Sequence, residues 1–194
     1  DLSKIEQPIL QLEKEGRERV HIFGYSVGGY VAVWLAHQHT QRVGKIVTLG
    51  TKFDWDPESA QIEVGKVDSE KIAEKIPAFA RILEHRHAPN DWKLLLRQTA
   101  SMMLALGAQP LLGEKEFRSI NHEVLILLGD RDDMADRKYS ESVAEWLPRG
   151  RFLSLPDTPH PLEKTDLGTL LEILSAIFKS SQEPKTDLSS HPHF

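Results

Sequence analysis

The sequence VHIFGYSVGG, residues 20–29, decides how this chain is expected to fold. An apolar run of strand length ends at Gly24, and residues 30–37, which are apolar on all sides, follow Gly29 directly. This pattern predicts a buried strand, a sharp turn and a buried helix. Within the turn, residues 24–28 match G-x-S-x-G, an arrangement that exposes a serine at a strained strand-to-helix corner.

The corner is expected to require glycine on both sides of the serine. A side chain at Gly24 or Gly28 would collide with the neighbouring strand or helix. Ser26 Oγ then stands at the N-terminus of a helix, where the helix dipole and the Val27 amide stabilise a developing negative charge. Glycine-rich strand-to-helix turns also bind phosphate, so the motif alone leaves a phosphate cradle as an alternative.

The rest of the chain alternates strands and helices. Residues 45–50 (KIVTLG) and 124–129 (VLILLG) are continuous apolar runs, typical of strands covered on both faces, and residues 151–155 form a weaker fourth run. Helices are predicted over residues 2–12, 139–147 and 167–178. The alternation predicts an α/β fold with a mostly parallel sheet flanked by helices.

One long interval, residues 52–122, contains no convincing strand and is too long for a loop of a compact core. Helices are predicted over residues 72–83, which Pro77 is expected to kink or split, and over residues 92–106 after an Asn90 cap. The interval therefore predicts an inserted helical cap. The expected organisation is a core over residues 1–51 and 123–179, the cap over residues 52–122, and a loose tail over residues 180–194.

Two downstream residues complete a set that would activate Ser26. A serine hydroxyl is a weak nucleophile and requires a base and a group that orients the base. Asp132 follows the strand at residues 124–129, and His160 follows the last predicted strand. Loops at the carboxyl ends of parallel strands gather at one edge of a sheet, so the three residues are expected to meet there. Asp130 and Asp133 are alternatives to Asp132.

These motifs resemble those of the α/β-hydrolase fold superfamily, in particular its cap-bearing, esterase-like members. The resemblance rests on GYSVGG at residues 24–29, LLGDRD at residues 127–132 and the Pro-His pair at residues 159–160, and it extends over residues 1–179. It implies that the chain is an esterase-like serine hydrolase of the EC 3.1 class. The expected substrate is a small or medium carboxylic ester or thioester, cleaved through an acyl-enzyme.

The resemblance also implies the roles of the site residues. Ser26 is the nucleophile, Asp132 the acid, His160 the base and the Val27 amide an oxyanion donor. The family's acid stands three residues after the glycine, which favours Asp132 over Asp130 and Asp133. Relatives use the same triad as lactonases, C–C bond hydrolases and peroxidases, and a non-catalytic ligand-binding module is a further alternative.

Two features depart from the family pattern. Family members carry early strands and an oxyanion loop before the serine, whereas 25 residues precede Ser26 here. We therefore expect this chain to be a fragment without the N-terminal part of the sheet, and the second oxyanion donor to lie outside it. Thr158 and Pro159 stand before His160, where the family more often has glycine.

Composition excludes several other classes. The 194 residues include no cysteine, which removes disulfides, thiol catalysis and cysteine-ligated metals. The net charge of −5 and the lack of a basic stripe argue against a nucleic-acid partner. No apolar run approaches the roughly 18 residues of a membrane span, so a soluble, cytoplasmic protein is expected. No dinucleotide or P-loop motif is present, and neither a cofactor nor a metal is expected. Nothing in the sequence indicates the oligomeric state.

The cap contains residues that fit either a pocket or an ordinary core. These are Trp55, Phe79, Trp92, Met102, Met103 and Leu106. Packing in a core is the commoner role for such side chains. Asp54 and Asp56 flank Trp55 and are expected either at the mouth of the site or as caps of a turn.

Overall fold

A computed structural model describes residues 19–180 of the chain. Its centre is a four-stranded parallel sheet in the order β1-β2-β3-β4. The strands are β1 (Val20–Tyr25), β2 (Val43–Leu49), β3 (Val124–Arg131) and β4 (Gly150–Pro159). The predicted α/β class and parallel sheet are therefore confirmed. The predicted helix over residues 2–12 and residues 181–194 of the predicted tail lie outside the described residues.

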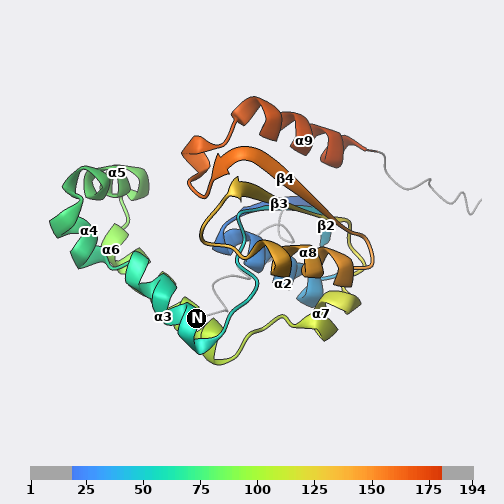
Figure 1. Ribbon diagram of the computed structural model, residues 1–194, viewed down its shortest axis with the longest axis horizontal. Helices are drawn as coiled ribbons and strands as arrows, with labels where there is room; N and C mark the ends of the chain where they lie inside the picture. Colours follow the sequence, from blue (N-terminus) through green and yellow to red (C-terminus); the bar gives the residue numbers. More distant parts are fainter. Residues whose placement is uncertain (1–18, 181–194) are drawn as a thin grey trace, which may run out of the picture.

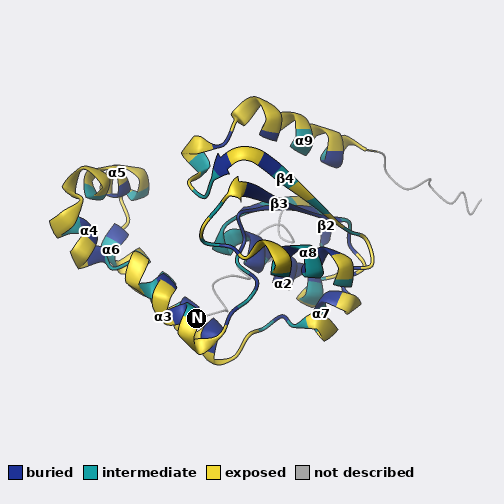
Figure 2. Cartoon of the chain, viewed as in Figure 1, coloured by how far each residue is buried: buried dark blue, intermediate teal, exposed yellow. Residues whose placement is uncertain are grey.

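Helices cover both faces of this sheet. The helices α2 (Val27–Gln38) and α8 (Arg137–Trp146) pack on one face, and α9 (Leu167–Lys179) packs on the other (Figure 1). The central strands β2 and β3 are buried over most of their length, as Figure 2 shows. Their continuous apolar sequences follow from this double coverage, because neither face of either strand meets water.

The interval between β2 and β3 forms five helices. They are α3 (Pro57–Lys66), α4 (Ser69–Lys75), α5 (Pro77–His87), α6 (Trp92–Ala108) and α7 (Glu114–Ser119). The first four form an arm that extends away from the sheet, in which α3 packs along α6 (Figure 1). The fifth helix returns to the sheet and buries Phe117 completely in the core. The domain boundaries after residues 51 and 122 stay a prediction.

Aspartate is the N-cap residue of most of the helices between residues 19 and 180. The side chains that accept hydrogen bonds from first-turn N–H groups are those of Asp56, Asp68, Asp91, Asp136 and Asp166. The prediction that Asn90 caps α6 is wrong. The helix starts at Trp92, and Asp91 Oδ1 accepts from the N–H groups of Lys93 and Leu94 at 2.8 and 3.2 Å. A carboxylate at this position also interacts favourably with the positive end of the helix dipole.

Two further details position the site. Pro77 splits the helix predicted over residues 72–83, because α4 ends at Lys75 and α5 begins at Pro77. The strand β4 extends to Pro159, beyond the predicted end at residue 155, so His160 follows it directly. Within residues 19–180, no helix combines the length and the apolar composition needed to span a bilayer.

The close packing of α3 on α6 predicts opposite effects for two glycine substitutions. A Cβ at Gly107 would lie 2.4 Å from Ala60 Cβ and 2.7 Å from the Asp56 carbonyl oxygen, whereas a Cβ at Gly65 meets nothing within 4 Å. Gly107→Ala is therefore expected to lower the free energy of unfolding by about 1–3 kcal/mol. Gly65→Ala, inside α3, is expected to raise it by about 0.5–1 kcal/mol. Urea unfolding of both variants measures the difference, and equal effects would contradict this helix contact.

Candidate active site

The turn between β1 and α2 holds Ser26 in a strained conformation. Ser26 has φ 52° and ψ −126°, a region that residues with a side chain rarely adopt. Its N–H donates to the Leu49 carbonyl at 2.8 Å, and its own carbonyl accepts from Thr51 Oγ1 at 3.0 Å. The end of β2 therefore holds the serine from two directions.

The glycines around Ser26 differ from the expectation. A Cβ at Gly24 would lie 2.6 Å from the Gly28 carbonyl oxygen, so the close approach of strand and helix requires glycine there. The expectation that a side chain at Gly28 would collide is wrong, because a Cβ at that position meets nothing within 4 Å. Gly29 is the second constrained position, since its Cβ would lie 1.9 Å from Thr51 Oγ1.

The fold brings Ser26, His160 and Asp132 together in one line of hydrogen bonds. His160 Nε2 lies 3.2 Å from Ser26 Oγ, and His160 Nδ1 lies 2.9 Å from Asp132 Oδ2. Ser26, His160 and Asp132 directly follow the carboxyl ends of β1, β4 and β3, which lie at the same end of the parallel sheet. The Asp132 side chain is 2% exposed and that of His160 is 11% exposed. The imidazole is therefore placed between a hydroxyl and a buried carboxylate.

Asp132 is held in place on both of its oxygens. Oδ2 faces His160, and Oδ1 accepts from the N–H groups of Met134 and Ala135 at 2.9 and 3.1 Å. Burial opposes ionisation of this carboxyl group, but the bonds from His160 and the two amides outweigh it and hold its pKa below the ordinary 3.8. The carboxylate is thus the stable form at neutral pH.

The two alternative aspartates do not face the histidine. Asp130 Oδ1 accepts from the Thr158 N–H at 3.3 Å, and Asp133 is exposed. Space beside Asp132 is guaranteed by Gly50, whose φ is 58°. A Cβ on Gly50 would lie 2.9 Å from Asp132 Oδ2 and 3.2 Å from His160 Nδ1, so a side chain at this position would press on both groups.

Tyr25 contacts the histidine loop from the residue before the serine. Its hydroxyl donates to the His160 carbonyl oxygen at 3.0 Å, and its ring lies 5.4 Å from the imidazole between centroids. Burial raises the pKa of the Tyr25 phenol, so the hydroxyl stays protonated and able to donate. Tyr25, the residue between Gly24 and Ser26 in the motif, thereby connects the serine turn to the histidine loop.

A cavity of about 20 Å³ opens beside Ser26 and His160. Of the cap residues considered from the sequence, Trp55 and Met103 line it. Phe79 is 41% exposed, and Trp92 packs in a separate cluster with Ile72 and Leu83. The segment between β2 and β3 therefore contributes two apolar side chains to the wall of the cavity.

The Val27 amide stands at the first position of α2. Its N–H forms no hydrogen bond with any residue between 19 and 180, although it lies directly after the serine. An unpaired N–H at a helix N-terminus is a good donor to an anion. Over the same residues, no three His, Asp or Glu side chains form a group that would hold a metal ion.

Comparison with known proteins identifies the fold. A family model described as the alpha/beta hydrolase fold matches residues 5–69, and no curated protein matches the chain. A putative non-heme bromoperoxidase, BpoC of Mycobacterium tuberculosis H37Rv, has a TM-score of 0.65 at 19% identity, covering 92% of this chain and 74% of its own.

Two further solved structures give the same result. A protein from a study of carboxylesterases of the thaumarchaeon Nitrososphaera gargenis has a TM-score of 0.64 at 19% identity, over 92% of this chain and 73% of its own. A mutant of CumD, a meta-cleavage product hydrolase of Pseudomonas fluorescens IP01, has a TM-score of 0.63 at 17% identity, over 93% and 72%. This chain has the alpha/beta-hydrolase fold.

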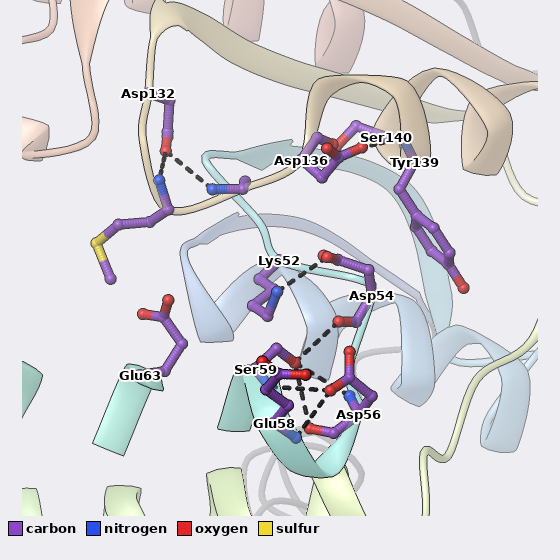
Figure 3. Close-up of polar contacts among 12 residues, drawn as sticks. Lys52, Asp54, Asp56, Glu58, Ser59, Glu63, Asp132, Asp136, Tyr139 and Ser140 are labelled. Carbon is purple, nitrogen blue, oxygen red and sulfur yellow. Dashed lines mark hydrogen bonds and ion pairs between the residues drawn. The ribbon is translucent and has the colours of Figure 1, made fainter. Parts of the chain in front are cut away.

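Several residues lie beside the cavity although the sequence does not predict that they belong to the site. Lys52, Glu63 and Met134 line the cavity together with Ser26. Lys52 Nζ pairs with Asp54 Oδ2 at 2.9 Å (Figure 3). It also lies 5.7 Å from the centre of the Trp55 ring. The sequence indicates a place near the site for Lys52 only because this residue comes just after a strand of the sheet. Nothing in the sequence indicates that Glu63, a glutamate within a helix, faces the cavity.

Asp54 and Asp56 have different roles in this fold. Asp54 pairs with Lys52 near the cavity, whereas Asp56 caps α3 in a capping box with Ser59 (Figure 3). Bonds from the Ser59 and Glu58 amides lower the pKa of Asp56. The turn-capping alternative is therefore confirmed for Asp56, whereas Asp54 does not line the cavity itself and pairs with Lys52, which does.

The hydrogen bonds of Asp132 predict an acid-dependent contribution to stability. Because its folded pKa is lowered, the carboxylate stabilises the fold above the ordinary pKa of 3.8, and this contribution disappears as the pH falls through the folded value. Asp132→Asn is expected to lower the free energy of unfolding by about 1–3 kcal/mol at pH 7, with a smaller difference below pH 3.8.

Chemical unfolding across this pH range measures the effect. Asp133→Asn, which removes an exposed carboxylate from the same loop, is the matched control and is expected to have little effect at any pH. If the two variants had the same pH profile, the hydrogen bonds of Asp132 would not hold its carboxylate as described.

Proposed function

We propose that this chain is a serine hydrolase that cleaves a small or medium carboxylic ester or thioester through an acyl-enzyme, with Ser26, His160 and Asp132 as its catalytic triad. The observation that carries the proposal is the line from Ser26 Oγ through His160 to Asp132, with steps of 3.2 and 2.9 Å. The hydrolase fold and its neighbours among known hydrolases support it. An esterase of the EC 3.1 class is the activity we favour.

In this mechanism His160 Nε2 accepts the proton of Ser26 Oγ as the oxygen attacks the substrate carbonyl. Asp132 keeps the Nδ1 proton in place and stabilises the imidazolium that forms. His160 then returns its proton to the leaving alcohol or thiol, which departs and leaves the acyl group on Ser26. Water, deprotonated by His160, attacks this acyl group and releases the acid and the free serine.

The tetrahedral intermediate places a negative charge next to the start of α2. The Val27 N–H, unpaired within residues 19–180, is the donor that we assign to this oxyanion. Its position at the positive end of a helix of 12 residues adds a favourable dipole. We also propose that residues 52–122 act as the cap, because Trp55 and Met103 from this segment wall the cavity beside the serine.

Other reactions of the same triad are the second candidate. The structural neighbours include a protein titled a putative non-heme bromoperoxidase and one titled a meta-cleavage product hydrolase. Because one fold serves many reactions, the residues that line the cavity beside Ser26 would decide which of these reactions, or lactone opening, this chain catalyses. Assays with esters, lactones and C–C bonded diketones distinguish them, and all require Ser26.

The proposal predicts that Ser26 is an activated nucleophile. The unsubstituted protein is expected to react covalently with a fluorophosphonate probe and to hydrolyse short 4-nitrophenyl esters, because His160 Nε2 lies 3.2 Å from Ser26 Oγ and can accept its proton. Ser26→Ala is expected to abolish labelling and to lower kcat by on the order of 10⁴-fold or more. Full hydrolysis by Ser26→Ala would exclude this mechanism.

Tyr25 is predicted to hold the histidine loop in its working position. Tyr25→Phe keeps the ring contact but removes the hydrogen bond to the His160 carbonyl, so kcat is expected to fall roughly 2–10-fold with little change in KM. The control is Tyr139→Phe, because the Tyr139 hydroxyl bonds to no residue in the described range. Steady-state kinetics measure both, and equal kcat values for the two variants would contradict the role.

A further inference from the structure

Glu63 is a buried carboxylate whose position the triad does not explain. It lies on α3 in the arm, its side chain is 8% exposed, and it lines the cavity that also contains Ser26 and His160. Figure 3 shows the side chain directed from α3 toward the loop that carries Asp132. Charged side chains are almost never buried unless they are paired, so the partners of this carboxylate need an account.

Within residues 19–180, only one of the Glu63 carboxylate oxygens has a partner. Glu63 Oε1 pairs with Lys66 Nζ at 2.8 Å, while Oε2 accepts no hydrogen bond from any residue in the described part of the chain. The Lys66 side chain is 40% exposed, so water competes for its ammonium group. An ion pair that served only to stabilise α3 would be formed equally well on the outer face of the helix, in water. Glu63 instead presents a free oxygen to the cavity.

The other charged side chain in the cavity is already neutralised. Lys52 donates to Asp54 at 2.9 Å and lies over the face of Trp55, so its ammonium group has both an anion and an aromatic ring. Trp55 and Met103 supply the apolar walls. Low polarity strengthens the attraction between Glu63 and a cation that enters the cavity.

We propose that Glu63 determines specificity by binding a primary ammonium group of the substrate, so that this hydrolase prefers esters that carry an amine close to the scissile carbonyl. This inference rests on the proposed function, which it makes more specific. A cavity of about 20 Å³ holds one group of the size of a water molecule. An ammonium group has this size, and a carboxylate oxygen is its natural acceptor.

The experiment compares esters that differ only in this group. Ethyl 3-aminopropanoate and ethyl butanoate are matched in shape, with NH₃⁺ replacing CH₃. At pH 7, Glu63→Gln is expected to lower kcat/KM for the amino ester at least about ten-fold relative to the unsubstituted protein. The kcat/KM for ethyl butanoate is expected to change less than about three-fold. We compare the ratio of kcat/KM for the two esters in the unsubstituted protein with the same ratio in Glu63→Gln. The intrinsic reactivities of the two esters cancel in this comparison.

Two further variants separate this role from a general effect of charge. Glu58→Gln removes the same charge from an exposed position of α3 and is expected to leave the ester preference unchanged. Lys66→Gln removes the group that competes for the Glu63 carboxylate and is expected to increase the preference for the amino ester. An unchanged or smaller preference in Lys66→Gln would mean that the cation does not contact Glu63.

A competition assay tests the ammonium subsite whether the amine belongs to the acyl part or to the alcohol part of the substrate. Propylammonium is expected to inhibit the hydrolysis of ethyl butanoate more strongly than 1-propanol in the unsubstituted protein and equally in Glu63→Gln. If ethyl butanoate is cleaved but neither the ester ratio nor the inhibition depends on Glu63, this inference is wrong and the proposed function stands. If neither ester is cleaved and Ser26 does not react with a fluorophosphonate, the proposed function fails, and the inference with it.

Discussion

The contact between β1 and α2 at Gly24 is the constraint on which the rest of the site depends. The helix N-terminus approaches the strand so closely that a Cβ at Gly24 would lie 2.6 Å from the Gly28 carbonyl oxygen. The chain therefore has to reverse sharply at Ser26, and it does so with φ 52°. Such a conformation costs about 1–3 kcal/mol and persists only where its surroundings fix it. Here the end of β2 fixes it, through hydrogen bonds from the Ser26 N–H to Leu49 and from Thr51 to the Ser26 carbonyl.

The same end of β2 also places the groups that face the serine. Gly50 follows directly, and its lack of a side chain leaves the space in which Asp132 and His160 approach one another. Four parallel strands thus contribute to one end of the sheet, with β1 and β2 fixing Ser26, β3 ending just before Asp132 and β4 ending just before His160. Displacing β1, β3 or β4 would break at least one of the two contacts of His160, so the hydrogen-bonded line depends on the parallel register.

Much of this arrangement could be predicted from the sequence because it depends on local patterns. The apolar runs at residues 45–50 and 124–129 indicate strands, and G-x-S-x-G at a strand-to-helix boundary indicates the turn. What the sequence does not reveal depends on contacts between distant segments. The sequence alone does not show which of Gly28 and Gly29 has to be glycine. Thr51 packs against the helix at Gly29, so of these two only Gly29 lacks room for a Cβ. The same limit applies to Glu63, whose burial depends on how α3 lies over the serine.

In the proposed function, the reaction and the choice of substrate depend on different parts of this molecule. The hydrogen-bonded line is built from strand ends of the sheet, where close backbone contacts leave little freedom to change. Trp55, Glu63 and Met103 belong instead to the segment between β2 and β3, most of which extends away from the sheet with much of its surface exposed (Figure 2). A substitution at Glu63 or Met103 therefore alters the wall of the cavity at a distance from the strand ends that carry the hydrogen-bonded line. Because Glu63 faces the cavity from α3, the polarity of the cavity depends on the packing of α3 against α6, which is the contact that Gly107 makes possible.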